Sequence, residues 1–279
     1  MTKIKVTKGF FSKPNYVVKM IRKRLFLMNK NYLLLICGDT GNGKSYTALT
    51  IASQIDPTFK DEVETRVVFT AKQFMKLLTS GKLDKGNVVI WDEAGVGIPA
   101  REWQDISNKM INYVLQTFRH KNLCVIFTTP SISFIDAGAR RLFHAYVEMR
   151  RVIKKQNVAR AKWYNFHHIP RTGKTYTPTL RDQYGERIPW IDFPKPSKEI
   201  IGPYELSKNT FTSELNSGIM KGLEESEILK NKKKYSIKEM VDISKNKNIL
   251  KTEEVMLEFD IGIKRAQKIS NLLKSDTPT

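Results

Sequence analysis

Cysteine is scarce in this chain: among 279 residues only Cys37 and Cys124 occur, each inside an apolar run. Two cysteines cannot form the disulfide framework of a small secreted domain or a cysteine-rich zinc module. They are typical of buried, reduced thiols in a cytosolic protein. The content of 41% hydrophobic and 27% charged residues also excludes disorder throughout, and the length predicts one large domain or one large and one small.

Long apolar runs are also missing. The most apolar early stretches, Leu25 to Met28 and Tyr32 to Cys37, are separated by the polar residues Asn29, Lys30 and Asn31. Both are far shorter than the roughly 20 residues that a membrane span needs. The basic start of the chain precedes no uninterrupted apolar core with a small-residue cleavage site, which argues against a secretory signal. We therefore expect a cytoplasmic protein with no integral membrane association.

Acidic residues are absent from two segments, 1–30 and 149–181, which each hold nine lysines or arginines. These segments account for most of the net charge of +20. Positive charge gathered in this way favours a polyanion as partner, and nucleic acid is the commonest large polyanion in a cytoplasm. Two alternatives stay open. The charges could form an ordinary solvated surface, or residues 16–27 could form a basic amphipathic helix on a membrane surface.

Between about residues 32 and 150, short apolar runs alternate with stretches of helical period. This alternation predicts strand–helix–strand units around a parallel sheet, and hence an α/β fold. The expected helical stretches are 48–55, 74–78 and 106–118. The expected strands are Tyr32–Cys37, Arg66–Phe69, Asn87–Trp91, Leu123–Thr128 and Ala145–Val152.

The pattern changes after residue 152. Residues 156–181 predict a basic hairpin with interleaved aromatic residues, and a proline-rich stretch follows at 188–203. A lysine-rich link at 230–234 then leads to a small helical end. We therefore expect three parts: a basic N-terminal segment 1–30, a main domain 31–229 and a C-terminal domain 230–279.

The clearest motif lies between the first expected strand and the first expected helix, and fits GxxxxGK[ST], the P-loop. Its glycines let backbone N–H groups face phosphate, Lys44 reaches the β and γ phosphates, and the Ser45 hydroxyl binds magnesium. The motif therefore predicts ATP and Mg²⁺ as cofactors. The expected nucleotide-binding residues are Gly38, Asp39, Thr40, Gly41, Asn42, Gly43, Lys44, Ser45 and Tyr46.

Two adjacent carboxylates, Asp92 and Glu93, follow the third expected strand. At this distance after a P-loop, Asp92 is expected to hold magnesium through water, and Glu93 to orient the attacking water. The pair therefore predicts ATP hydrolysis rather than binding alone. The DxxG pattern at Asp92 to Gly95 also occurs in GTPases, but the NKxD guanine signature does not occur in this sequence.

Four features together resemble the FtsK–HerA superfamily of ATP-driven DNA motors and its viral packaging relatives. They are the P-loop, the strand ending in Asp92 and Glu93, the run from Arg119 to Ser131, and the helical C-terminus. The resemblance implies a RecA-like P-loop fold, a ring-shaped homo-oligomer such as a hexamer, and double-stranded DNA as partner.

The resemblance also implies further catalytic residues. A polar sensor follows the fourth strand in this family, which points to Thr128 or Thr129. An arginine reaches into the neighbouring subunit's site and stabilises the transferring phosphoryl group. Arg119 is the first candidate for that arginine, and Arg140 and Arg141 are the others.

Three short helical patterns close the chain, at 236–241, 252–259 and 263–273, and the last two read as a helix-turn-helix. The segment 258–269 resembles the DNA-reading domain of FtsK-type translocases, although the chain stops before a wing would form. A three-helix packing unit without a DNA-reading role is the alternative.

These observations predict an ATPase that translocates or packages double-stranded DNA. The single motor domain favours viral packaging or mobile-element transfer, with a capsid or mobilisation protein as a further partner and a virus-infected or element-bearing cell as the setting. The alternatives are an ATP-switched DNA-binding regulator, and a helicase loader or phage-assembly ATPase that moves no DNA.

Overall fold

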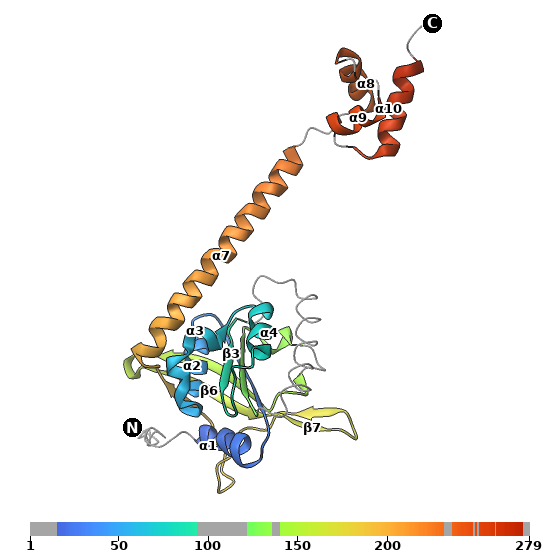
Figure 1. Ribbon diagram of the computed structural model, residues 1–279. Helices are drawn as coiled ribbons and strands as arrows, with labels where there is room; N and C mark the ends of the chain where they lie inside the picture. The colour runs from blue at the N-terminus through green and yellow to red at the C-terminus, as the bar shows by residue number, and fades with distance from the viewer. Residues whose placement is uncertain are drawn as a thin grey trace, which may run out of the picture. The chain divides into compact units, whose positions relative to one another are not determined.

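The computed structural model describes residues 16–93, 122–135, 140–231, 236–247, 249, 251–259 and 261–275. Contacts between residues divide the chain into two compact units, Met1–Leu215 and Asn216–Thr279 (Figure 1). The division falls inside α7 (Lys198–Asn231), a single helix of 34 residues. The domain boundary expected near residue 230 lies close to the end of that helix. The expected helix at 106–118 lies outside the described residues.

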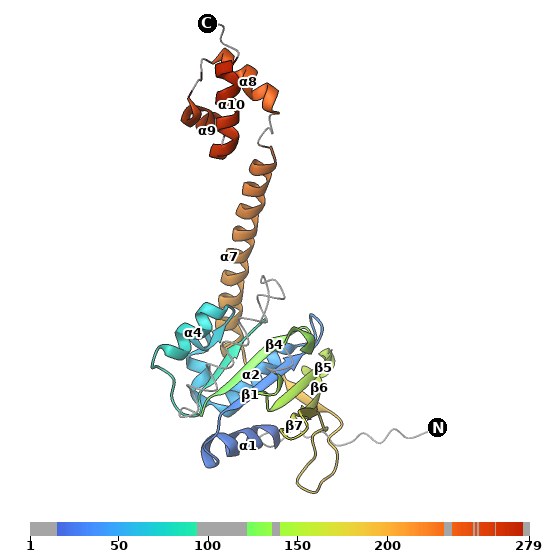
Figure 2. The ribbon, with the colours of Figure 1, turned by 90° about the vertical axis from the view of Figure 1, so that its right-hand side faces the viewer.

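A seven-stranded sheet lies at the centre of the first unit, in the order β2-β3-β4-β1-β5-β6-β9. Figure 2 shows β4, β1, β5 and β6 within this sheet. The first five strands in this order, β2, β3, β4, β1 and β5, are parallel. They match the five strands expected from the sequence. The mostly parallel α/β architecture is therefore confirmed. The strands are β1 (Tyr32–Cys37), β2 (Val67–Val68), β3 (Val88–Trp91), β4 (Cys124–Thr129), β5 (Ala145–Ile153), β6 (Val158–Asn165) and β9 (Ile191–Pro194).

Both faces of the parallel part of the sheet are covered, which explains the continuous apolar runs. On β1, Leu34 and Ile36 belong to one hydrophobic core, while Leu33 and Leu35 belong to a second core on the other face. The first core includes residues of α1 (Tyr16–Arg22), α2 (Lys44–Ile55) and α7. The second includes residues of α4 (Ala71–Thr79), whose start is fixed by a capping box.

The basic segment 156–181, expected to form one hairpin, is divided between two sheets. Strand β6 joins the edge of the main sheet, antiparallel to β5 and to β9. Its Ala161 and Trp163 alternate inward and are fully buried, so the strand completes the core. A separate two-stranded sheet, β7 (His167–Ile169) with β8 (Lys174–Tyr176), forms the hairpin that remains.

The apolar side of the N-terminal basic helix is part of the core. Val17, Val18 and Ile21 of α1 are buried, and Leu25 of the π-helix η1 (Lys23–Leu27) is buried with them. Those side chains therefore cannot also enter a membrane surface, as the amphipathic-helix alternative requires. No helix among the described residues is long and apolar enough to span a membrane. The described part of this unit also contains the short helices η2 (Pro57–Asp61), α3 (Val63–Arg66), η3 (Ile132–Phe134) and η4 (Lys154–Gln156).

The second unit holds three helices where the sequence predicts them: α8 (Ile237–Asn246), α9 (Thr252–Phe259) and α10 (Ile263–Ser275). Ser236 and Glu239 form a capping box at the start of α8. The helices share a core of their own, which comprises Met240, Val241, Val255, Ala266, Ile269 and Leu273.

His144, just before β5, makes the first unit sensitive to acid. The Leu33 N–H donates to its Nδ1 (2.9 Å), and Arg24 Nη2 lies 2.6 Å from its Nε2. Burial, together with the charge of Arg24, lowers the pKa of His144 to about 3. Unfolded histidine has a pKa near 6.5, so the unfolded chain binds the proton first as the pH falls.

We therefore expect the free energy of unfolding to decrease below pH 6.5, by at most about 1.4 kcal/mol per pH unit from this residue. His144→Asn removes the titrating group and should show a flatter pH dependence between pH 7.5 and 5. Urea denaturation of both proteins across this range measures the difference. Parallel pH curves would contradict the prediction.

Candidate nucleotide-binding site

The P-loop spans the turn from β1 to α2, and close packing requires its glycines. Gly38, Gly41 and Gly43 all have positive φ angles, between 82° and 153°. A Cβ atom at Gly38 would lie 2.7 Å from Met149 Cβ, and one at Gly43 would lie 3.1 Å from Ala159 Cβ. Larger residues would therefore be strained at all three positions, would collide with β5 at Gly38 and would be crowded against β6 at Gly43.

Lys44, the first residue of α2, folds back over this loop. Its Nζ donates to the carbonyl oxygens of Gly38 (2.7 Å) and Asp39 (3.0 Å). Burial lowers the pKa of Lys44, while the charges of Asp92 and Glu93 act in the opposite direction. The ammonium group thus lies at the loop where phosphate is expected to bind.

Asp92 lies at the end of β3, is fully buried and accepts three hydrogen bonds from side chains. Its Oδ2 accepts from the Ser45 hydroxyl (3.0 Å) and from the Tyr204 hydroxyl (2.7 Å). Its Oδ1 accepts from Thr128 Oγ1 (2.6 Å). The two predicted metal ligands, Ser45 and Asp92, therefore meet at hydrogen-bond distance. A hydroxyl beside a carboxylate suits Mg²⁺, which prefers oxygen ligands and keeps several waters.

Glu93, the predicted catalytic residue, has a φ angle of 51°, in the left-handed region that non-glycine residues rarely adopt. Its N–H donates to Thr128 Oγ1 (2.8 Å), so Thr128 contacts both carboxylate residues. This contact follows from the sheet order, because β4 lies between β1 and β3. Thr129, the other sensor candidate, instead has its hydroxyl 3.4 Å from Ser131 O.

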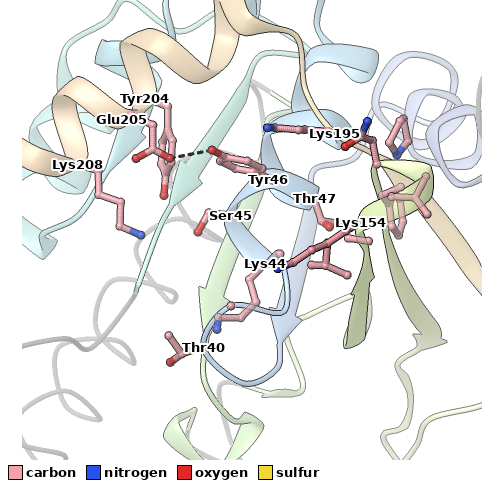
Figure 3. Close-up of a pocket in the computed structure, with 18 of the residues that line it drawn as sticks. Thr40, Lys44, Ser45, Tyr46, Thr47, Lys154, Lys195, Tyr204, Glu205 and Lys208 are labelled. Atoms are coloured by element: carbon pink, nitrogen blue, oxygen red, sulfur yellow. Dashed lines mark hydrogen bonds between the residues drawn. The ribbon is translucent and has the colours of Figure 1, made fainter.

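Helix α7 adds three side chains that the sequence analysis did not identify (Figure 3). Tyr204 donates to Asp92, Glu205 accepts from the Tyr46 hydroxyl (3.0 Å), and the Lys208 ammonium lies 2.7 Å from Glu93 Oε1. Tyr204 and Lys208 are four residues apart and so lie on one helix face. This four-residue spacing was the signal that the sequence offered for these site residues. The same spacing of polar residues occurs in many solvent-exposed helices, so it did not single them out.

These residues enclose a cavity of about 850 Å³. Thr40, Lys44, Ser45, Glu93 and Lys208 line its polar part. The β5–β6 edge and β9 line the rest with mostly apolar side chains, among them Val152, Val158, Ala159, Phe193 and Pro194. A site with a cationic end and an apolar wall can hold the phosphates and the base of a nucleotide.

Two of the three arginine candidates, Arg140 and Arg141, are among the described residues. Arg140 Nε donates to the carbonyl oxygen of Ile135 (2.8 Å), which lies just before it in the chain. Neither Arg140 nor Arg141 lines the cavity. Arg119, the first candidate, lies outside the described residues. An arginine acting on a neighbouring subunit therefore stays a prediction.

Comparison with known proteins gives one family match. Residues 49–181 match the family model described as Zonular occludens toxin (Zot). This span starts inside α2, just after the P-loop, and covers somewhat less than half of the chain. No curated protein sequence matches the chain.

Solved structures match this chain, and two of them do so at low identity. The N-terminal domain of zonular occludens toxin from Neisseria meningitidis has 17% identity and a TM-score of 0.32, with 57% of this chain and 100% of that chain covered. The KaiC-like protein PH0186 from Pyrococcus horikoshii OT3 has 14% identity and a TM-score of 0.28, with 53% of this chain and 90% of that chain covered.

These findings support a broader assignment than the resemblance to FtsK–HerA motors. The family match is to Zot, and it does not single out the FtsK–HerA superfamily. The site contains a P-loop after β1 and a buried carboxylate, Asp92, after β3. Asp92 accepts a hydrogen bond from the P-loop residue Ser45, and strand β4 lies between β1 and β3 in the sheet. The chain therefore has a mostly parallel α/β fold that carries a P-loop nucleotide-binding site, and just under half of it is similar to the Zot family.

Proposed function

We propose that this protein is an ATP-hydrolysing motor that translocates or packages double-stranded DNA as a ring-shaped oligomer. One observation supports hydrolysis above all. Glu93, which lines the P-loop cavity, directly follows Asp92, the predicted magnesium ligand, and both residues contact Thr128. A carboxylate in this position can orient a water molecule and accept its proton.

In the proposed reaction, the P-loop N–H groups and Lys44 bind the phosphates, and the apolar wall of β5, β6 and β9 takes the base. Ser45, and Asp92 through water, would hold Mg²⁺, which neutralises charge on the β and γ phosphates. Glu93 orients the water that attacks the γ-phosphorus. The bond between that phosphorus and the β–γ bridging oxygen breaks, so the products are ADP and inorganic phosphate.

The charge distribution supports DNA as the partner. Arg171 and Lys174, at the exposed end of the β7–β8 hairpin, lie in the acid-free segment 149–181. Two other cations of that segment are already engaged within the protein: Arg160 forms a bidentate pair with Asp192, and Lys162 lies 4.9 Å from the centroid of the Trp190 ring. The exposed cations at the end of the hairpin are therefore available to contact phosphates.

A DNA-binding regulator is the second candidate, and the C-terminal unit favours it. Exposed Lys264, Arg265 and Lys268 lie on α10, while Ala266, Ile269 and Leu273 of that helix are buried in the core of the unit. A cationic helix on a small three-helix unit can enter a major groove. In this function, ATP would switch a bound state without DNA movement.

The deciding experiment measures ATP turnover with and without duplex DNA, together with displacement of a third strand annealed to the duplex. A motor should be stimulated by unrelated duplexes and should displace the third strand. Arg171→Gln/Lys174→Gln should lose much of the stimulation, because phosphate contacts dominate affinity. Lys72→Gln/Lys76→Gln on α4 makes the same charge change outside the basic segments and should retain it.

A protein that responds to one DNA sequence, without strand displacement, would support the regulator. ATP turnover that no DNA affects would contradict both candidates and favour an assembly ATPase.

A further inference from the structure

Besides Lys44, three lysines line the P-loop cavity, and one of them, Lys208, contacts the carboxylate pair. We propose that Lys208 of α7 binds the terminal phosphate of ATP within the same chain, and that it leaves Glu93 when ATP binds. This inference rests on the proposed ATPase function and adds to it a residue that distinguishes ATP from ADP.

The position of Lys208 is set by Tyr204, one turn earlier on α7. Tyr204 is 2% exposed, its hydroxyl donates to Asp92, and its ring lies 6.3 Å from Tyr46 and 6.4 Å from Phe69, centroid to centroid. The start of α7 is therefore anchored directly to the metal-binding carboxylate. From this anchor, the Lys208 side chain extends into the cavity (Figure 3).

Lys208 forms an ion pair with Glu93, the carboxylate that the proposed hydrolysis needs. Its Nζ lies 2.7 Å from Glu93 Oε1 and 3.7 Å from Asp92 Oδ2. A carboxylate oxygen that accepts a hydrogen bond from an ammonium group is less available to hold and orient a water molecule. As long as Lys208 stays on Glu93, the site is held in an inactive arrangement.

The Lys208 side chain is only 26% exposed and lies beside the carboxylates of Glu93 and Asp92. A charged group in a partly closed cavity needs an anionic partner. Glu93 is that partner in this structure, and the γ-phosphate would replace it beside Lys44 and Ser45.

The opposing interpretation is that Lys208 only ties α7 to β3. The two interpretations differ in nucleotide selectivity. A residue that only links two elements contributes to stability, and its loss should change the affinities for ATP and ADP equally. A ligand of the terminal phosphate affects ATP much more than ADP, because ADP lacks that group.

The test measures dissociation constants for the non-hydrolysable ATP analogue AMP-PNP and for ADP, by calorimetry with Mg²⁺. Lys208→Met should weaken AMP-PNP binding by about tenfold or more, as expected for a lost hydrogen bond between charged groups. The dissociation constant for ADP should change by less than about twofold. Lys198→Met, at the exposed start of the same helix, is the matched control and should change neither constant.

A second variant keeps Lys208 in place. Glu93→Gln removes the competing carboxylate, so AMP-PNP should bind more tightly while ADP affinity stays nearly constant. The double variant Glu93→Gln/Lys208→Met should lose this gain. Equal changes for both nucleotides, or a gain that persists in the double variant, would overturn the proposal. If the wild-type protein bound neither nucleotide, the proposed ATPase function itself would fail.

Discussion

Glu93→Gln should bind ATP but hydrolyse it at least about 10²-fold more slowly than the wild-type protein, because only the group that orients and deprotonates water is removed. The amide keeps the size of the side chain, and the Glu93 N–H can still donate to Thr128. Phosphate release at saturating ATP, combined with calorimetric binding, measures both properties.

Lys44→Ala provides the contrast. It removes the ammonium group at the P-loop, so nucleotide binding itself should be lost. The two variants should therefore differ in kind: one binds without turnover and the other does not bind. Wild-type turnover in Glu93→Gln would show that Glu93 is not catalytic and would leave the hydrolytic role unassigned.

Asp56→Ala should lower the free energy of unfolding by about 3–5 kcal/mol, because it removes the buried partner of a buried arginine. Asp56 is 4% exposed and Arg66, with which it forms an ion pair, is 3% exposed. The same carboxylate accepts hydrogen bonds from the backbone N–H of Thr58 and of Val88, and from the side chain of Asn87. It thereby links the end of α2 to α3 and β3.

Glu62→Ala is the matched control. Glu62 Oε2 lies 3.0 Å from Nε of the same Arg66, but its side chain is 49% exposed. Exposed ion pairs contribute at most about 1 kcal/mol, so this substitution should be nearly neutral. Urea denaturation of both variants tests the difference. Similar, small losses would show that the Asp56 network contributes little to stability.

The P-loop could be predicted from sequence because its requirements are local. Gly38, Gly41 and Gly43 need positive φ angles, and the residues that face phosphate are consecutive in the chain. The five parallel strands were predictable for a related reason, since strands covered on both faces are continuously apolar. Asp92 and Glu93 were predictable from their place at the end of such a strand.

The tertiary structure alone decided which distant side chains complete the site. Tyr204 is 112 residues from Asp92 and Lys208 is 115 residues from Glu93, and no periodicity in the sequence links these positions. The choice of Thr128 over Thr129 likewise depends on the register between β3 and β4, in which Trp91 pairs with Phe127 and the next residues are Asp92 and Thr128. The same holds for β6, whose basic and aromatic residues suggest a free hairpin until β5 and β9 pair with it. Local sequence determines backbone conformation and burial, whereas contacts between distant elements depend on how those elements pack together.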